Sequence, residues 1–71
     1  MNNINLSESR HTEDIEGVID EVIAPGKEWR VRVYGIYWHA VTKGKNHFEP
    51  GQHVSVIGRK HLKLVILPIP A

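Results

Sequence analysis

The stretch that decides the fold is EWRVRVYGIYWHAV, residues 28–41. Apolar side chains alternate with arginines in its first half, and an alternating pattern resumes after Gly35. A period of two gives a β-strand one apolar and one polar face, and a glycine between two such runs is typical of a hairpin turn. We therefore expect two antiparallel strands that turn near Gly35, with Trp29 and Trp38 in the core.

The run before this hairpin, residues 14–23, is ambiguous between helix and strand. Its apolar side chains keep no strict period of two, and their spacing would also suit a helix. Valine and isoleucine dominate the run, however, and Gly17 would suit a β-bulge or a sharp bend that shifts the alternation by one residue. We predict a strand that ends at a turn formed by Pro25 and Gly26.

The run after the central hairpin predicts a second hairpin. Residues 53–57 would form one strand and residues 58–61 the turn. Every second residue of the closing strand is apolar and should face inward: Leu62, Leu64 and Ile66. Two later prolines should end the pairing, because proline has no N–H to donate to a neighbouring strand.

These runs predict an all-β fold of one domain. The chain has 71 residues, which is enough for a single core. Five short strands without a helix cannot bury their apolar side chains as a flat sheet, so the sheet should close into a small five-stranded OB-fold β-barrel. The longest connection, residues 42–52, then joins the third and fourth strands. Residues 1–12 are polar and are predicted to be a flexible leader before a domain at 13–71.

Several short motifs occur in a characteristic order over about residues 14–67. They are Gly17, Pro25-Gly26, Gly35, Trp38-His39-Ala40, Phe48 with Gly51, Val54-Ser55-Val56 and Leu62-Lys63-Leu64-Val65. In this order and spacing the chain resembles the C-terminal soluble domain of NfeD proteins. The resemblance implies an OB-type barrel that serves partner proteins of the stomatin and flotillin type. Relatives usually carry membrane-spanning segments ahead of this domain, and some carry a serine protease domain.

Charge is divided unevenly along the chain, although the net charge is only +1. Residues 1–28 hold seven of the eight acidic residues, whereas residues 29–71 hold seven of the nine lysines and arginines. One interpretation is that an acidic first strand pairs with basic neighbours when the barrel closes. The other is that the basic side receives an anionic partner.

The outer face of the second and third strands is the first candidate binding surface. It would present basic and aromatic side chains: Arg30, Arg32, Tyr34, Tyr37 and His39. OB-type barrels often bind single-stranded nucleic acid on this face, with aromatic rings stacked on bases. The low net charge argues against nucleic acid. Protein contact on this face, and ion pairing of the two arginines with Glu16 and Asp20, are the other two interpretations.

The closing strand offers a second candidate surface. If its inward positions are as expected, an apolar strip points outward: Val65, Leu67 and Ile69. Such a strip marks either a partner or membrane-proximal contact, or packing against Ile4 and Leu6 of the leader.

Residues that could support catalysis or metal binding are sparse. The chain has no cysteine, and its three serines lie in the leader or, as Ser55, between two core valines. The five histidines fit no zinc spacing, although His53 and His61 could face each other on the last hairpin. No apolar run approaches the roughly 18 residues of a membrane-spanning helix.

We therefore predict a non-catalytic protein–protein interaction module without cofactor or metal. The resemblance implies a stomatin-like or flotillin-like membrane protein, or a protease, as partner, and a cytoplasmic location at the membrane surface through that partner. The alternative is an OB-fold that binds single-stranded nucleic acid.

Overall fold

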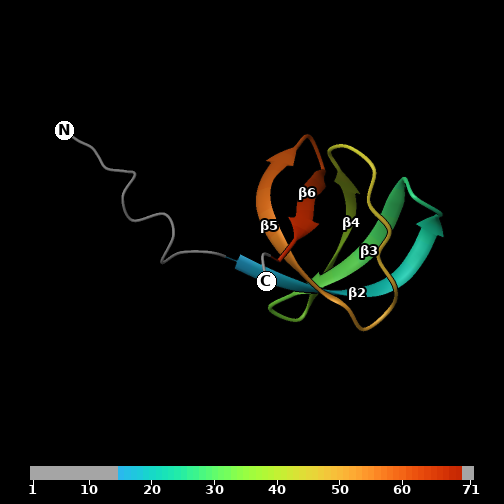
Figure 1. The fold of residues 1–71 in the computed structure, drawn as a ribbon. Coiled ribbons are helices and arrows are strands. Elements are labelled where there is room, and N and C mark those ends of the chain that lie inside the picture. The colour runs from blue at the N-terminus through green and yellow to red at the C-terminus, as the bar shows by residue number, and fades with distance from the viewer. Residues whose placement is uncertain (1–14, 70–71) are drawn as a thin grey trace.

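The computed structural model describes residues 15–69, and within that range it contains five strands and no helix (Figure 1). The strands are β2 (Ile15–Ala24), β3 (Glu28–Val33), β4 (Ile36–Thr42), β5 (His53–Lys60) and β6 (Lys63–Pro68). The ambiguous first run is a strand, as predicted. The predicted leader, with Ile4 and Leu6, lies outside the described residues.

The strands close into a barrel in the order β2-β3-β4-β6-β5, and β2 pairs with β5 to complete the ring. All pairs are antiparallel except β4 with β6, which run parallel from His39 opposite Lys63 to Thr42 opposite Ile66. Five strands in this order, with the last strand inserted between the third and fourth, form the predicted OB-type barrel. Figure 1 shows the strands curling around a common interior, with β2 curving along one side.

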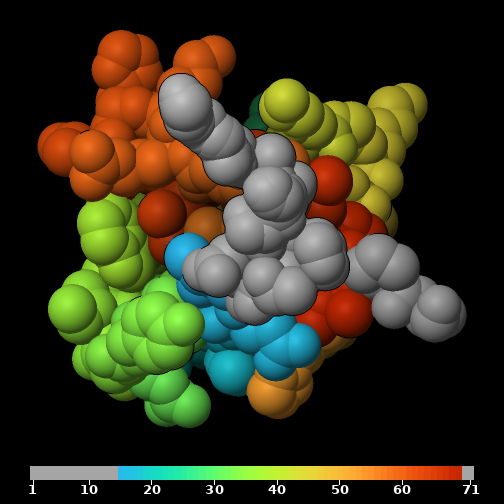
Figure 2. Space-filling model, turned by 90° about the vertical axis from the view of Figure 1, so that its left-hand side faces the viewer, coloured from blue at the N-terminus to red at the C-terminus, as the bar shows by residue number. Residues whose placement is uncertain are grey.

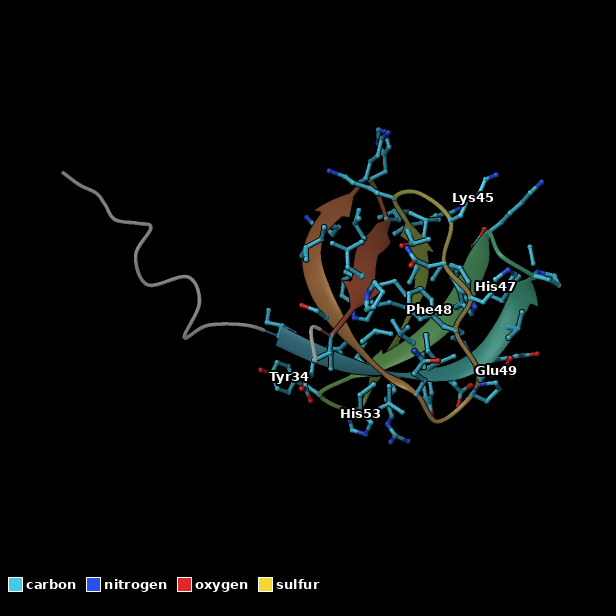
Figure 3. All side chains as sticks on the ribbon, in the orientation of Figure 1. Tyr34, Lys45, His47, Phe48, Glu49 and His53 are labelled. Atoms are coloured by element: carbon cyan, nitrogen blue, oxygen red, sulfur yellow. The ribbon has the colours of Figure 1, made fainter. Side chains whose placement is uncertain are left out.

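The core is built around Trp29, which is completely buried. Its ring packs edge-on against Phe48, with ring centroids 4.9 Å apart and planes at 72°. Its indole Nε1 donates a hydrogen bond to the backbone oxygen of Phe48 at 3.1 Å. Phe48 belongs to the long loop between β4 and β5, and Figure 3 shows it pointing into the barrel. The loop therefore supplies a side chain that fills the interior.

The same loop is fastened to β2 by two backbone hydrogen bonds. Ile19 N donates to Gln52 O at 2.9 Å, and Gly51 N donates to Ile19 O at 2.8 Å. Ile19 is itself a buried core residue. The loop is therefore attached to the barrel in two ways, through its backbone at Gly51 and Gln52 and through the side chain of Phe48.

The first two predicted turns are confirmed. Pro25 and Gly26 form the first turn, since Lys27 N donates to Ala24 O at 2.8 Å and Gly26 has φ 73°. Tyr34 and Gly35 form the second, with φ 52° and 79°, the left-handed pair of a type I′ hairpin.

The last turn was wrongly placed. β5 continues to Lys60, which pairs with Lys63, so the turn consists of His61 and Leu62. Leu62 is consequently 82% exposed instead of facing inward.

Trp38, expected in the core, is only partly buried and packs against the outside of the core cluster. It precedes His39, where β6 begins to pair with β4, so no neighbouring strand covers that part of β4 on the β6 side.

The expected bulge at Gly17 is also wrong. Gly17 pairs regularly with Val54, whereas the pairing of β2 with β3 skips Asp20 and Ile23. These two extra residues explain the loss of strict alternation in β2. At Gly17 a Cβ would lie 3.0 Å from Val33 Cγ2, so the glycine permits a close approach of β3.

We expect Phe48→Ala to lower the free energy of unfolding by about 3–5 kcal/mol, because it empties a buried aromatic position against Trp29. Chemical denaturation followed by circular dichroism measures this change. Tyr34→Ala is the matched control, since it removes an aromatic ring that is 85% exposed and should change stability by less than about 0.5 kcal/mol. Equal effects of the two substitutions would contradict the interior role of Phe48.

Candidate functional site

The outer face of β3 and β4 carries the predicted binding residues, but Arg30 is held on the sheet by acids of β2. Its Nε and Nη2 donate to Asp20 Oδ2 at 2.9 and 2.7 Å, and Nη2 lies 2.9 Å from Glu21 Oε1. The hydrogen bond to Asp20 raises the pKa of Arg30. The guanidinium also lies over the Tyr37 ring, 5.5 Å from its centroid. Residues of the barrel therefore already bind two of the three guanidinium nitrogens of Arg30.

His39 is likewise engaged, in a network centred on Glu28. Its Nδ1 lies 2.5 Å from Glu28 Oε2, and Lys63 Nζ donates to Glu28 Oε1 at 3.1 Å. The hydrogen bond with His39, followed by that with Lys63, lowers the pKa of Glu28. The three residues come from β3, β4 and β6, so the network spans the parallel seam of the barrel.

The expected pairing of Glu16 with an arginine is not found. Glu16 Oε1 instead lies 3.5 Å from His53 Nδ1. Among the described residues no ion pair involves Arg32, which points outward from β3 and is exposed.

Four exposed side chains remain at the end of the β3–β4 hairpin. We call them the hairpin surface: Arg32, Tyr34, Ile36 and Tyr37. The exposed fractions of Tyr34, Ile36 and Tyr37 are 85%, 60% and 54%. Figure 3 shows Tyr34 outside the barrel, and in Figure 2 this hairpin projects at the lower corner, in green. Exposed aromatic side chains on a rigid turn are typical of protein interfaces.

Ile36 was not among the predicted binding residues. It pairs with Val33 and so lies on the inward side of the hairpin, where alternation predicts burial. Its position directly after the turn places it past the end of the barrel, which leaves it exposed. In the sequence, the position of Ile36 directly after the turn glycine, Gly35, could have indicated that Ile36 is exposed.

The predicted apolar strip is less exposed than the hairpin surface. Val65 and Leu67 are half-buried, and Ile69 is just exposed. Val65 is flanked by Val41 of β4 and Gly58 of β5, and Leu67 lies opposite Ser55. The side chains of Val65 and Leu67 are therefore partly covered by the neighbouring strands and do not protrude from the surface.

The two histidines considered as a metal pair lie apart. His53 opens β5, whereas His61 lies in the turn beyond the other end of that strand. In the range 15–69 no three histidine or acidic side chains lie together as metal ligands would. The same range contains no helix that is long and apolar enough to cross a membrane.

Comparison with known proteins finds one matching protein family and two solved structures of similar fold. The model described as "NfeD-like C-terminal, partner-binding domain" matches residues 13–68. No curated protein sequence matches the chain.

Two solved structures are similar to the barrel. The C-terminal domain of stomatin operon partner protein 1510-C from Pyrococcus horikoshii superimposes with a TM-score of 0.71 at 26% identity, over 82% of this chain and 88% of that one. The soluble domain of a membrane protein implicated in regulation of membrane protease activity from Corynebacterium glutamicum has a TM-score of 0.68 at 22% identity, over 83% and 94% of the two chains.

We expect the Glu28 network to make stability depend on pH. Because the folded pKa of Glu28 is lower than its ordinary value of 4.5, its interactions stabilise the fold above that value and are lost as pH falls through the folded pKa. The difference in free energy of unfolding between the wild type and Glu28→Gln should therefore be largest near neutral pH and shrink in acid. Chemical denaturation over a pH series measures it.

The matched control for that series is Glu49→Gln, because no ion pair involves Glu49 in the described part of the chain. Its difference from the wild type should be small at every pH. A Glu28→Gln difference that stays constant with pH would show that the carboxylate charge contributes nothing.

Proposed function

Because the chain belongs to the NfeD-like C-terminal, partner-binding family, we propose that this barrel is a non-catalytic docking module for a membrane protein of the stomatin or flotillin type. The observation that carries the proposal is the family match, which spans all five strands. The similar domain from Pyrococcus horikoshii is named as a stomatin operon partner, which points to the same class of protein.

The hairpin surface is the contact we propose for that partner. Tyr34 and Tyr37 offer large, rigid apolar area, and Arg32 adds a charge with no ion-pair partner among residues 15–69. Tyr34 holds a left-handed backbone conformation, with φ 52°, that asparagine or glycine adopts more readily. An exposed tyrosine kept at such a position is consistent with selection for contact rather than for stability.

The module acts without chemistry of its own in this proposal. Ser55 lies midway along β5, and no hydrogen bond joins it to a histidine or lysine in the part of the chain that the structure describes. The partner holds the module at the cytoplasmic surface of a membrane. A membrane protease is the second kind of partner that the resemblance suggests.

Binding of single-stranded nucleic acid is the competing function for the same surface. The exposed tyrosines and Arg32 favour it, since aromatic stacking and a phosphate contact are what such binding needs. Arg30 and His39 count against it, because acids of the barrel already bind Nε and Nη2 of Arg30 and Nδ1 of His39. Protein contact fits the remaining apolar surface better.

We expect Tyr34→Ala/Tyr37→Ala to weaken binding to a stomatin-family protein from the same genome by about tenfold or more, because aromatic anchors dominate protein interfaces. Isothermal titration calorimetry measures the affinity. Ile23→Ala is the matched control, since Ile23 is an exposed apolar residue at the far end of β2. Unchanged affinity in the folded double variant would contradict the hairpin surface as the contact.

The nucleic-acid alternative has its own measurement, an NMR titration of the labelled domain with short single-stranded DNA at low and high salt. The docking proposal expects no shifts at the hairpin surface at protein concentrations where non-specific binding of roughly 10⁻⁴ M would show. Salt-sensitive shifts confined to Arg32, Tyr34 and Tyr37 would favour nucleic acid instead.

A further inference from the structure

The outer face of β4, β6 and β5 contains a groove that the hairpin surface does not include. It consists of two adjoining hollows of about 390 and 400 Å³ that share Lys60. Val41 lines one hollow and Val65 the other, and these two valines pair directly across β4 and β6. The hollows are therefore parts of one continuous surface.

The floor of this groove is open because of Gly58. Gly58 pairs with Val65, so the row Val41, Val65 and Gly58 crosses three strands. A Cβ built on Gly58 would meet no atom within 4 Å. The missing side chain thus leaves space over a half-buried apolar floor, where other positions of the sheet carry side chains.

Two exposed apolar side chains line the groove. Leu62, in the turn after β5, is 82% exposed and lines the first hollow. Ile57, where the pairing of β5 with β6 shifts register, is exposed and lines the second. Apolar side chains exposed beside a concave apolar floor are typical of a docking site.

The rest of the lining is basic. It includes four of the eight lysines and arginines in residues 15–69, namely Lys43, Arg59, Lys60 and Lys63, and no acid. Of these four, Lys63 alone forms an ion pair among the described residues, with Glu28. Figure 2 shows the loop after β4, which carries Lys43, and the β5–β6 turn as two lobes, yellow and orange. This unbalanced charge favours an anionic occupant.

We propose that this basic groove binds an acidic amphipathic helix of a partner protein. Its carboxylates would meet Lys43, Arg59 and Lys60, and its apolar face would lie on the valine floor beside Leu62. On the groove floor β6 is paired on both sides, with β4 and with β5, so it offers no edge to which a partner could add a strand. A helix laid into the groove satisfies both the charge and the apolar floor.

A membrane surface fits the groove less well. A flat layer of anionic headgroups could contact the lysines, but Val41 and Val65 lie half-buried at the floor, where a lipid layer would not reach them. The inference does not depend on the proposed function, because the hairpin surface and the groove share no residue. Glu28 is bonded to Lys63 of the groove and to His39, which belongs to neither surface.

The test uses a synthetic helical peptide of about four turns, with leucines on one face and glutamates on the other. Titrated into the ¹⁵N-labelled domain, it should shift the amides of Val41, Gly58, Leu62 and Val65. A peptide with lysine in place of every glutamate should bind at least about tenfold more weakly, because like charges would face each other. Equal binding of the two peptides, or shifts confined to the hairpin surface, would overturn the proposal.

Charge-reversal variants locate the contact. Lys43→Glu/Lys60→Glu should weaken binding of the acidic peptide by about tenfold or more. Lys27→Glu is the matched control, an exposed lysine in the β2–β3 turn, and should change affinity by less than about twofold. Leu62→Ser, which removes an exposed side chain and so leaves the core intact, should also weaken binding. Insensitivity to the double reversal or to Leu62→Ser would overturn the groove as the site.

Vesicles of phosphatidylglycerol and phosphatidylcholine test the membrane alternative. Sedimentation of the domain with these vesicles, lost in Lys43→Glu/Lys60→Glu while the acidic peptide fails to bind, would assign the groove to lipid and overturn the proposal. Binding of a stomatin-family protein that depends on Tyr34 and Tyr37 tests the proposed function separately, so either proposal can fail while the other stands.

Discussion

The contact between Trp29 and Phe48 is the interaction on which the rest of the barrel depends. A domain this small has little apolar area to bury, and one buried indole fills a large share of the interior. Its N–H needs an acceptor, and the backbone oxygen of Phe48 provides it. The same contact fixes the long loop after β4, whose end is bonded to Ile19 of β2. The contact that packs the core therefore also fixes the position of the loop.

Once the interior is filled in this way, function is left to the outer faces, where charge decides what is available. Acids of β2 form ion pairs with Arg30, and Glu28 bonds to His39 of β4 and to Lys63 of β6. Two unlike surfaces remain, one at the β3–β4 turn and one that crosses the parallel pair of β4 and β6. The hairpin surface is aromatic and apolar with one arginine, whereas the groove beside Lys60 is basic with an apolar floor. A barrel with two such surfaces is suited to joining two partners.

Local patterns predicted the five strands, the barrel and the turns at Pro25 and Gly35, because alternation and turn chemistry act over a few residues. What they missed depends on distant neighbours. Leu62 is exposed because β5 extends to Lys60, and Trp38 is only partly buried because β6 joins β4 one residue later. The interior role of Phe48 and the groove require pairings between strands far apart in sequence. Periodicity within one strand contains no such information.

The most direct test of a docking role is a cross-saturation NMR measurement on the deuterated, ¹⁵N-labelled domain bound to a stomatin-family protein from the same genome. The method reports which amides lie against the partner. The account predicts transfer concentrated at the β3–β4 turn, around Tyr34 and Tyr37. Absence of binding, or transfer confined to β2 and the loop that contains Phe48, would contradict it.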